Sequence, residues 1–519
     1  MTNTGFATMS VAALLAETAN RLPENVAVIF GDQHISYREL WDQTRAYAGA
    51  LRARGIGPGN PVAVLIPNVP DFPRVYYAIL SLGAVVVPVH ALLKGEEIDY
   101  VLRDSGAKAL VCAAPLLGEG AKGAALAGID LLTVLVPDDR LAELPFPRLE
   151  DEAANAEPIV TFEPQSPFAT ATILYTSGTT GKPKGAEGGH FSLVEQVNTL
   201  LAGTLDMGAD DVILGCLPLF HTFGQTCVMN VGFRVGATIV MVPKFDGATA
   251  LALLNTHRCT IMTGVPTMYI ALFEAAKTNA ERPPLRYGVS GGAAIPVAVI
   301  ERVKQVYDID IHEGYGLTET SPVATFNHRG KPTRAGTVGQ PVWGVDVEIA
   351  DAENDAHIEL LPRGELGEIV IRGHNLMKGY LNRPDADAEA VVDGWFRTGD
   401  LGTKSDDDYV TIVDRKKDMI VRNGYNVYPR EVEEVLSTHP AVAMVAVFGI
   451  GHETHGQEIM AAITLSPGES VHADELIAFA KEHVAAYKYP RRVEILESLP
   501  LGPSGKVLKR ELVARFEEA

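Results

Sequence analysis

The sequence is poor in cysteine, in net positive charge and in long apolar runs, and each shortage excludes a class of protein. Its four cysteines lie far apart and form no CxxC pair, so we expect neither a disulfide framework nor a zinc site from them. The formal net charge of −21 provides no global positive field for nucleic acid or an anionic membrane. No apolar stretch approaches the roughly 20 residues of a membrane span, and the start, MTNTGFATMS, does not read as a signal peptide. We therefore expect a cytoplasmic protein with no nucleic-acid partner and no integral membrane segment.

Length and composition predict a multidomain α/β protein. At 519 residues and 47% hydrophobic content, the chain can bury a large core and form more than one domain. Short apolar runs alternate with amphipathic stretches such as 71–83 and 296–307, which predicts strands followed by helices and substantial parallel pairing. The predicted strands are 62–66, 84–89, 109–113, 211–218, 238–242, 260–265 and 286–292.

The pattern changes after about residue 340. Residues 364–373 and 407–416 alternate apolar and polar side chains, which is typical of a smaller, partly exposed sheet. The last hundred or so residues combine apolar runs with a helix predicted near 472–486, as expected of a compact α+β unit. The charged run DRKKD (414–418) lies between these two parts. We therefore predict one domain over 1–414 and a second over 415–519.

Residues 173–190 read ILYTSGTTGKPKGAEGGH, an apolar run followed by glycine, hydroxyl groups and lysine. A Walker A loop is excluded because Pro183 follows Lys182 where Ser or Thr is required, and because Thr176 stands where the first glycine is required. A flexible linker is disfavoured because core-like sequence flanks the segment on both sides. The remaining interpretation is a strand-to-helix loop whose N–H groups, hydroxyls and two lysines suit a polyphosphate.

A second glycine-rich segment, GEGAKG (118–123), matches the pattern G-x-G-x-x-G. Pro115 and two leucines separate it from the preceding predicted strand, so the context of a dinucleotide-binding loop is missing. We interpret this segment as a surface turn.

Taken whole, YTSGTTGKPKG resembles the phosphate-binding signature of the adenylate-forming superfamily, the acyl-CoA synthetases and their relatives. The resemblance covers nearly the whole chain and implies a large N-terminal α/β domain of layered sheets and helices, with a small β-barrel-like part, followed by a small mobile α+β domain. Later segments in the same order support it, namely GYGLTETSP (314–322), GWFRTGDLG (394–402), DRKKDMIVRNGYNVYPREVE (414–433) and PSGKVLKREL (503–512).

The resemblance implies a two-step reaction in which a carboxylate attacks ATP to give an acyl-adenylate, and a thiol, usually that of coenzyme A, then displaces AMP. ATP and coenzyme A are the implied co-substrates, and Mg²⁺ is the implied cofactor. Lys506 would stabilise charge between the carboxylate and the α-phosphate, and Lys184 would counter phosphate charge. Glu319, with Thr176, would bind the magnesium ion, and His221 would line the acyl–adenylate pocket.

The resemblance also implies a nucleotide site, a hinge and a coenzyme A contact. Lys417 matches the hinge position, and Gly424 lies where the pantetheine arm meets the small domain. Asp400, with Arg415 beside it, would accept hydrogen bonds from the ribose hydroxyls. The other implied ATP-binding residues are Thr176, Ser177, Gly178, Thr179, Thr180, Gly181 and Lys182 in the loop, Gly291, Gly292, Ala293 and Tyr315 around the adenine, and Gly316 and Thr318 beside them.

The acid is predicted from the residues of the implied acyl pocket, Phe220, Phe223, Val265 and Gly316. PLFHTFG lacks the aspartate with which amino-acid-activating relatives bind an ammonium group. Acetate-specific relatives carry tryptophan where this chain has Gly316, so we expect the glycine to leave space. The apolar surroundings favour a medium- or long-chain fatty acid, with an aryl acid such as a coumarate next.

Two other hypotheses are disfavoured. A fatty acyl-AMP ligase that loads a carrier protein has an insertion before the hinge, whereas 340–414 looks compact here. A nucleotide sensor without chemistry would be free to lose Glu319, Asp400 and Lys506, which are all present. A homodimer is compatible with the sequence.

Overall fold

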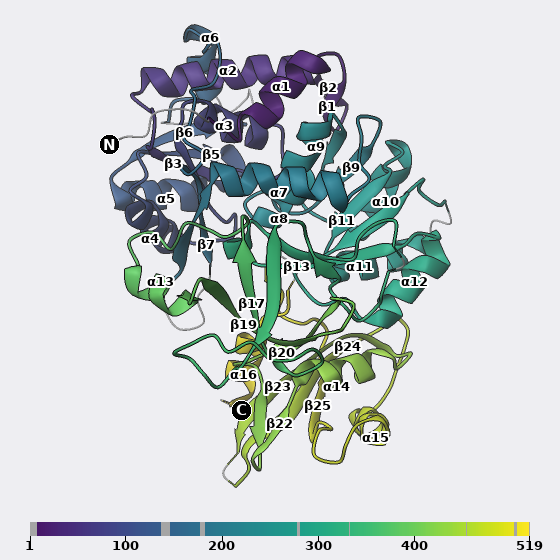
Figure 1. Ribbon diagram of the computed structural model, residues 1–519. Coiled ribbons are helices and arrows are strands. Elements are labelled where there is room, and N and C mark those ends of the chain that lie inside the picture. The colour runs from purple at the N-terminus through teal and green to yellow at the C-terminus, as the bar shows by residue number, and fades with distance from the viewer. Residues whose placement is uncertain are drawn as a thin grey trace.

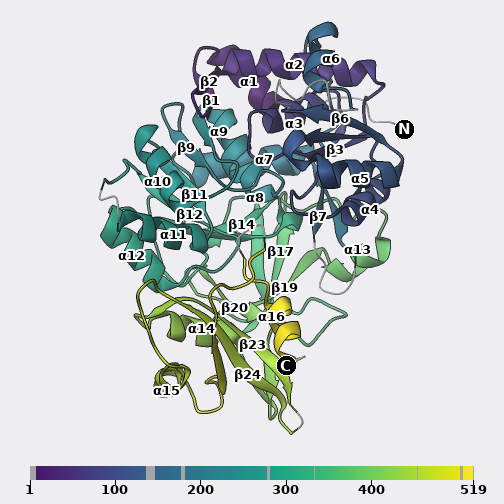
Figure 2. The ribbon, with the colours of Figure 1, turned by 180° about the vertical axis from the view of Figure 1, so that it is seen from behind.

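The described part of the chain folds into four β-sheets with helices packed against them (Figures 1 and 2). Three sheets belong to a large N-terminal part, and the fourth forms, with the last three helices, a small C-terminal part at the bottom of Figure 1. The predicted α/β class with a large first domain and a small last one is therefore confirmed. The computed structural model describes residues 8–135, 146–176, 182–277, 281–331, 333–452, 454–502 and 506–517.

The nine-stranded sheet is parallel in its centre, as expected for short apolar strands that alternate with helices. In spatial order its strands are β15 (Gln340–Pro341), β14 (Val323–Phe326), β13 (Ile311–Gly316), β12 (Tyr287–Ser290), β11 (Ile261–Gly264), β9 (Val212–Gly215), β10 (Thr238–Met241), β1 (Val26–Phe30) and β2 (Gln33–Ser36). Pairing is parallel from β13 to β1 and antiparallel at both edges.

The six-stranded sheet is parallel except at β8. In spatial order its strands are β6 (Asp130–Val134), β5 (Ala109–Ala113), β3 (Pro61–Leu65), β4 (Val85–Pro88), β7 (Thr170–Thr176) and β8 (Lys184–Gly189). Each of the seven predicted strands corresponds to an observed one, in β3, β4, β5, β9, β10, β11 and β12.

The two remaining sheets are smaller and mainly antiparallel. The third contains β16 (Val345–Ala350), β17 (Gly367–Gly373), β19 (Trp395–Lys404) and β18 (Val391–Val392), with β20 (Val410–Arg415) paired to β19. The fourth contains β22 (Tyr425–Val427), β21 (Ile420–Arg422), β24 (Gly456–Leu465) and β23 (Val442–His452), with β25 (Arg492–Ile495) parallel to β24. The predicted boundary after residue 414 lies one residue before the end of β20.

Local sequence signals place several helix ends. Ser36 and Glu39 form a capping box at the start of α2, and glycines in the left-handed conformation follow α4 and α5. The α-helices are α1 (Ala13–Arg21), α2 (Tyr37–Ala53), α3 (Asp71–Ser81), α4 (Gly95–Ser105), α5 (Leu117–Ala127), α6 (Leu149–Asn155), α7 (His190–Gly203), α8 (Thr222–Gly224), α9 (Val231–Val235), α10 (Gly247–Thr256), α11 (Pro266–Ala276), α12 (Val297–Tyr307), α13 (Pro384–Ala390), α14 (Pro429–Ser437), α15 (Ala473–His483) and α16 (Lys509–Glu517).

Residues 118–123 are helical, so the prediction of a surface turn there is wrong. The glycines are explained by packing, because a Cβ on Gly120 would lie 2.6 Å from Cys112 Sγ, and one on Gly123 would collide with Ile98. Glycine here allows α5 to approach β5 and α4 closely, and it marks a helix contact instead of a turn.

The six-stranded sheet is buried on both faces. Alternate residues of β3 point to opposite sides, so Val62 and Val64 join the main core while Ala63 and Leu65 join a second core that α4 and α5 cover. Burial on both faces explains the continuous apolar runs of these strands. Within the described residues, no helix has the length and apolarity needed to cross a membrane.

Candidate active site

Strands β7 and β8 flank residues 177–181 and pair with each other, which corrects the prediction of a strand-to-helix loop. β7 and β8 pair antiparallel, with Thr176 opposite Lys184, and α7 begins only at His190. The glycines after the loop let β8 lie close to β7, since a Cβ on Gly188 would lie 2.6 Å from Thr172 Oγ1. The described residues that flank positions 177–181 therefore belong to two paired strands, and the next described helix along the chain, α7, begins at His190.

The two lysines at the end of this loop contact different tyrosine rings. Lys182 Nζ lies 5.2 Å from the ring centroid of Tyr100, and Lys184 Nζ lies 5.0 Å from that of Tyr380, both within cation–π distance. The Tyr100 hydroxyl also donates a 2.8 Å hydrogen bond to the Pro183 carbonyl, which ties the loop to α4. The predicted loop residues Ser177, Gly178, Thr179, Thr180 and Gly181 lie outside the described residues.

Tyr380 joins the predicted magnesium ligand to the predicted phosphate lysine. Its hydroxyl donates a 2.9 Å hydrogen bond to Glu319 Oε1, while its ring faces Lys184. Glu319 lies in a short 3₁₀ helix, Thr318–Thr320, and only 8% of its surface is exposed. The residues just before Tyr380 hydrogen-bond to two different segments. The Met377 N–H donates to the Glu319 carbonyl, and the Lys378 N–H donates to the Glu187 carbonyl in β8. Two distant motifs thus converge on one aromatic side chain.

Asp400, Tyr315 and Arg415 form a polar cluster where the large and small parts meet. The Tyr315 hydroxyl donates a 2.6 Å hydrogen bond to Asp400 Oδ2, and Arg415 Nε lies 3.1 Å from Asp400 Oδ1. Asp400 and Arg415 face each other across β19 and β20. Burial, followed by the neighbouring Asp400 carboxylate, raises the pKa of Tyr315 well above its usual value. Tyr315 therefore keeps its proton and remains a hydrogen-bond donor to Asp400.

Lys506 of the small part lies among residues of the large part. A Cβ built on Gly292 would lie 3.7 Å from Lys506 Cε, so the lysine stem passes directly over this glycine. Gly292 has a φ of +78°, a conformation that favours glycine. The pKa of Lys506 is lowered from its usual value, first by burial and then by the positive Arg415. The carboxylates of Asp400 and Glu319 act in the opposite direction and offset part of this shift. Figure 2 shows the chain before α16 extending up from the small part toward the large one.

His221 is the first residue of a tightly held turn. Its Nδ1 accepts a 3.1 Å hydrogen bond from the Phe223 N–H and so caps α8. The Asn68 side-chain amide holds the residues that precede His221, because it donates to the Leu217 carbonyl at 2.7 Å and accepts from the Leu219 N–H at 2.9 Å. Burial lowers the pKa of His221 to about 4, and the positive Lys506 acts in the same direction. The neutral ring, with Nδ1 as acceptor, carries its proton on Nε2.

Two of the predicted acyl-pocket residues, Phe223 and Val265, lie beside Gly291 and Gly292, which are predicted to bind the adenine. A Cβ on Gly291 would lie 3.0 Å from Phe223 Cζ, and one on Gly292 would lie 3.7 Å from Val265 Cγ1. Phe220 lies further out, with its ring centroid 4.3 Å from that of His90. A cavity of about 570 Å³ between α2, α3 and the β1–β2 turn is lined by none of these residues.

The prediction that Gly316 leaves open space is wrong. A Cβ there would collide with the backbone carbonyl of Pro322, so any larger residue would require the following turn to move. Glycine at this position serves a close approach between two stretches of backbone. Thr318 lies two residues later, at the start of the short helix that carries Glu319, and Ala293 lies in the bend after β12.

The predicted hinge and coenzyme A residues lie in turns. Lys417 belongs to the turn that joins β20 to β21, and so to the connection between the large and small parts. Gly424, with a φ of +78°, follows Asn423, with a φ of 52°, in the two-residue turn between β21 and β22. Two positive φ angles are what a type I′ hairpin requires, so the turn alone explains this glycine. Among the described residues, none has an atom within 4 Å of a Cβ built on Gly424.

Three residues of the site were not predicted. Tyr380 and Asn68 stand in no recognisable motif, and only long-range contacts reveal them. Glu313 directly precedes the GYGLTE segment, which was a usable signal. Its side chain is 1% exposed, Oε1 accepts from the Ile295 N–H, and Oε2 has no hydrogen-bond partner among the described residues. Burial raises the pKa of Glu313 to about 7.

Comparison with known proteins decides the family. Residues 15–381 match the AMP-binding enzyme family, and residues 431–506 match the AMP-binding enzyme C-terminal domain. The chain belongs to the AMP-binding enzymes. This confirms the resemblance to the adenylate-forming superfamily.

Relatives of this AMP-binding enzyme act on several kinds of acid. A feruloyl-CoA synthase from an Amycolatopsis species is 36% identical over 505 residues, covering 96% of this chain and 97% of the relative. A long-chain-fatty-acid–CoA ligase from Bacillus subtilis is 31% identical over 540 residues, covering 98% and 95%. The crystal structure of ATP-bound MatB from Rhodopseudomonas palustris is similar, with a TM-score of 0.88, 30% identity and coverage of 98% and 99%.

Proposed function

We propose that this AMP-binding enzyme joins a hydrophobic carboxylic acid to coenzyme A at the expense of ATP. The observation that carries the proposal is the meeting of Lys506 from the small part with Glu319, Asp400 and Arg415 beside Gly292. A cation, a metal-binding carboxylate and a ribose-binding carboxylate in one place suit attack on a nucleotide phosphate.

In the first step, a carboxylate oxygen of the acid attacks the α-phosphorus of ATP, and the bond to the bridging oxygen of pyrophosphate breaks. Both reactants are anions, so their repulsion must be cancelled before they meet in line. Lys184 supplies charge on the β- and γ-phosphate side, and Lys506 supplies it between the carboxylate and the α-phosphate. Neutral His221 carries its proton on Nε2, where it serves as a donor that lines the acyl–adenylate pocket and not as a base.

Magnesium fits the oxygen ligands at this place. The Glu319 carboxylate is largely buried and, within the part of the chain that the structure describes, accepts a hydrogen bond from Tyr380 through Oε1, and the Thr176 hydroxyl lies at the end of β7. Mg²⁺ takes one or two protein oxygens together with phosphate oxygens and water, so these residues would hold it with the nucleotide. When bound, the ion neutralises phosphate charge.

In the second step, the thiol sulfur of coenzyme A attacks the acyl carbon, AMP departs with the electrons of the broken C–O bond, and the thiol proton is lost to solvent. Lys506 lies over Gly292 beside Val265, so we propose that it withdraws to let the thiol enter. Rotation at Lys417 would move the whole small domain, because β20 and β21 connect through that turn alone. Gly424 would then face the pantetheine arm.

We propose a medium- or long-chain fatty acid as the substrate. Phe223, Val265 and Met268 are buried and provide apolar surface. Phe223 and Val265 lie beside Gly291 and Gly292, and Met268 Sδ lies 3.8 Å from Cys216 Sγ. An aryl acid is the second candidate, because the Phe220 and His90 rings pack at 4.3 Å and form an aromatic surface in the same region.

The test is AMP release with a panel of acids, with and without coenzyme A. Saturated fatty acids of increasing length, ferulate, benzoate and malonate cover the classes of interest. We expect AMP release with a hydrophobic acid, a requirement for ATP and Mg²⁺, and a thioester product only when coenzyme A is present. Failure of every acid to release AMP would refute the enzyme assignment, and higher kcat/KM for ferulate than for any fatty acid would select the second candidate.

A further inference from the structure

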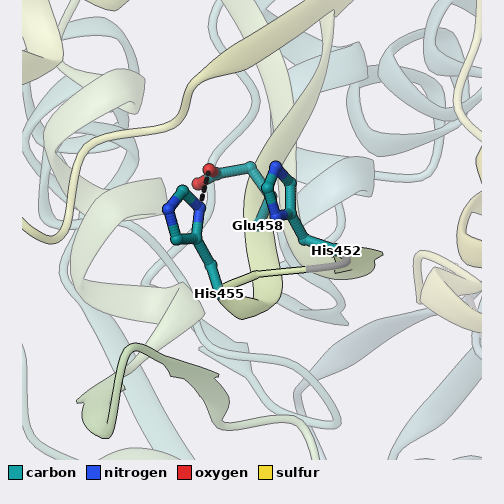
Figure 3. Close-up of side chains that lie close together, drawn as sticks. All are labelled: His452, His455 and Glu458. Carbon is teal, nitrogen blue, oxygen red and sulfur yellow. Dashed lines mark ion pairs between the residues drawn. The ribbon is translucent and has the colours of Figure 1, made fainter.

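The turn between β23 and β24 carries a group of side chains that plays no part in the proposed reaction. His452, His455 and Glu458 each offer one metal-ligating atom, and these atoms all lie within 4.8 Å of one another. Figure 3 shows the two imidazole rings and the carboxylate at the end of this hairpin. We propose that the cluster binds one transition-metal ion of the Zn²⁺ type, independently of ATP, coenzyme A and the acid.

Two of the three ligands already have the spacing that a metal requires. His455 Nδ1 lies 3.4 Å from Glu458 Oε2. In a tetrahedral site with Zn–N and Zn–O distances of roughly 2.0–2.2 Å, neighbouring ligand atoms lie about 3.4 Å apart. The spacing of this nitrogen and this oxygen suits an ion, and Arg422 Nη2, which lies 3.4 Å from the nitrogen and 3.0 Å from the oxygen, must turn aside when the ion binds.

The third ligand must rotate, and its surroundings allow it to do so. The His452 and His455 rings are stacked, with centroids 4.3 Å apart and planes 11° apart, so their nitrogen lone pairs do not yet point to a common centre. His452 is exposed, and among the described residues its Nδ1 has hydrogen-bond contacts with the neighbouring Thr454, at 3.3 Å from the N–H and 3.4 Å from the hydroxyl. Turning this imidazole gives up the two long contacts with Thr454 and the stacking on His455. A water molecule would complete the coordination.

The inner part of the cluster is held by its neighbours. Arg422 donates to both oxygens of Glu458, at 2.6 Å and 3.0 Å, and the His455 carbonyl accepts from the Asn423 N–H at 3.0 Å. These contacts keep Glu458 and His455 in place, as supporting residues do in metal sites. Arg422 also places a positive charge beside the site, so binding requires a metal that forms strong bonds to imidazole.

The ligand set selects the kind of metal. Two imidazoles and one carboxylate suit Zn²⁺, Ni²⁺ or Cu²⁺, whereas Mg²⁺ prefers oxygen ligands alone. The site therefore differs in chemistry from the proposed magnesium site at Glu319. Its distinctive sequence signal is HETH, two histidines that flank the tip of a hairpin.

The experiment is equilibrium dialysis or calorimetry of the full-length, tag-free protein with zinc chloride alone. Three variants are compared with the parent: His455→Ala, His452→Ala, and His472→Ala as the matched control, an exposed histidine of the same domain outside the cluster. We expect the parent and His472→Ala to bind one zinc ion per chain, and both cluster variants to lose it. MgCl₂ should neither occupy the site nor displace zinc.

Zinc binding that is equal in the parent and in His455→Ala would overturn the proposal, as would the absence of saturable binding to the parent. Unfolding curves without metal check that the variants are folded, and a zinc-induced rise in Tm confined to the parent and the control would support the site. AMP release is not a readout, so failure of the proposed ligase activity leaves this test unaffected.

Discussion

Tyr380→Phe is expected to weaken adenylation without unfolding the enzyme. The substitution removes the hydroxyl that donates 2.9 Å to Glu319 Oε1 and keeps the ring that faces Lys184 at 5.0 Å. A hydrogen bond to a charged group contributes about 1.5–3 kcal/mol. Because 1.4 kcal/mol corresponds to tenfold, the complete loss of this bond in the transition state predicts a fall of about 10- to 100-fold. The effect should appear in kcat/KM for MgATP, since Glu319 is the proposed magnesium ligand.

The assay is pyrophosphate release at saturating acid over a range of MgATP concentrations. Tyr307→Phe is the matched control, because it removes a buried tyrosine hydroxyl that donates 2.9 Å to the Leu272 carbonyl outside the site. Tyr380→Leu should be worse than Tyr380→Phe, since it also removes the ring beside Lys184, and cation–π contacts contribute about 0.5–2 kcal/mol. A Tyr380→Phe enzyme with the kcat/KM of the parent, or with no more loss than Tyr307→Phe, would refute the role of the hydroxyl.

Three further predictions concern charged and titrating groups. Lys506→Ala should slow adenylation about 10²- to 10³-fold, as loss of a transition-state donor does, while thioester formation from a supplied acyl-adenylate persists; equal loss of both half-reactions would contradict the assigned role. Burial lowers the pKa of the fully buried His190 to about 4, so on acidification the unfolded chain binds a proton at a higher pH than the folded chain does. The free energy of unfolding should therefore be highest above pH 6.5 and fall by about 3 kcal/mol as the pH approaches 4. His190→Asn, which keeps an acceptor for the Val11 N–H, should flatten denaturation midpoints in that window, and an unchanged slope would count against this. Burial raises the pKa of Glu313 to about 7, so its ionisation destabilises the folded chain as the pH rises from 4.5 through 7. The difference in free energy of unfolding between Glu313→Gln and the parent should therefore be up to about 3 kcal/mol more favourable to the variant at pH 8 than at pH 4.5. Urea denaturation at both pH values measures this difference, and an equal difference at the two pH values would show that the carboxyl is not the cause.

Several features of this enzyme could be read directly from the sequence. The strands that became β3, β5 and β10 are short apolar runs, and a strand buried on both faces needs nothing more than such a run between helices. The turn at Asn423–Gly424 is equally local, because its two positive φ angles select those residue types. The order of the motifs sufficed to predict the family, which the comparisons confirmed.

The structural role of several glycines could not be predicted without the fold. In 118–123 it marks helix packing, in β8 it marks two close strands, and at Gly316 it marks a backbone crossing at Pro322. In each case the sequence shows only that a side chain is missing. Which neighbour occupies that space is decided by segments far along the chain, so turn and loop predictions failed at 118–123 and after Lys184.

The site depends on the tertiary structure in the same way. Motif order predicted Glu319, Asp400 and Lys506, but it gave no sign of Tyr380, which contacts Glu319. The tertiary structure places Tyr380, which forms an isolated β-bridge with Ala186, between Glu319 and Lys184, and it brings Lys506 over Gly292. Local sequence determines the conformation of a segment through its nearest neighbours, whereas a hydrogen bond such as that from Tyr380 to Glu319 exists only once distant segments have packed together.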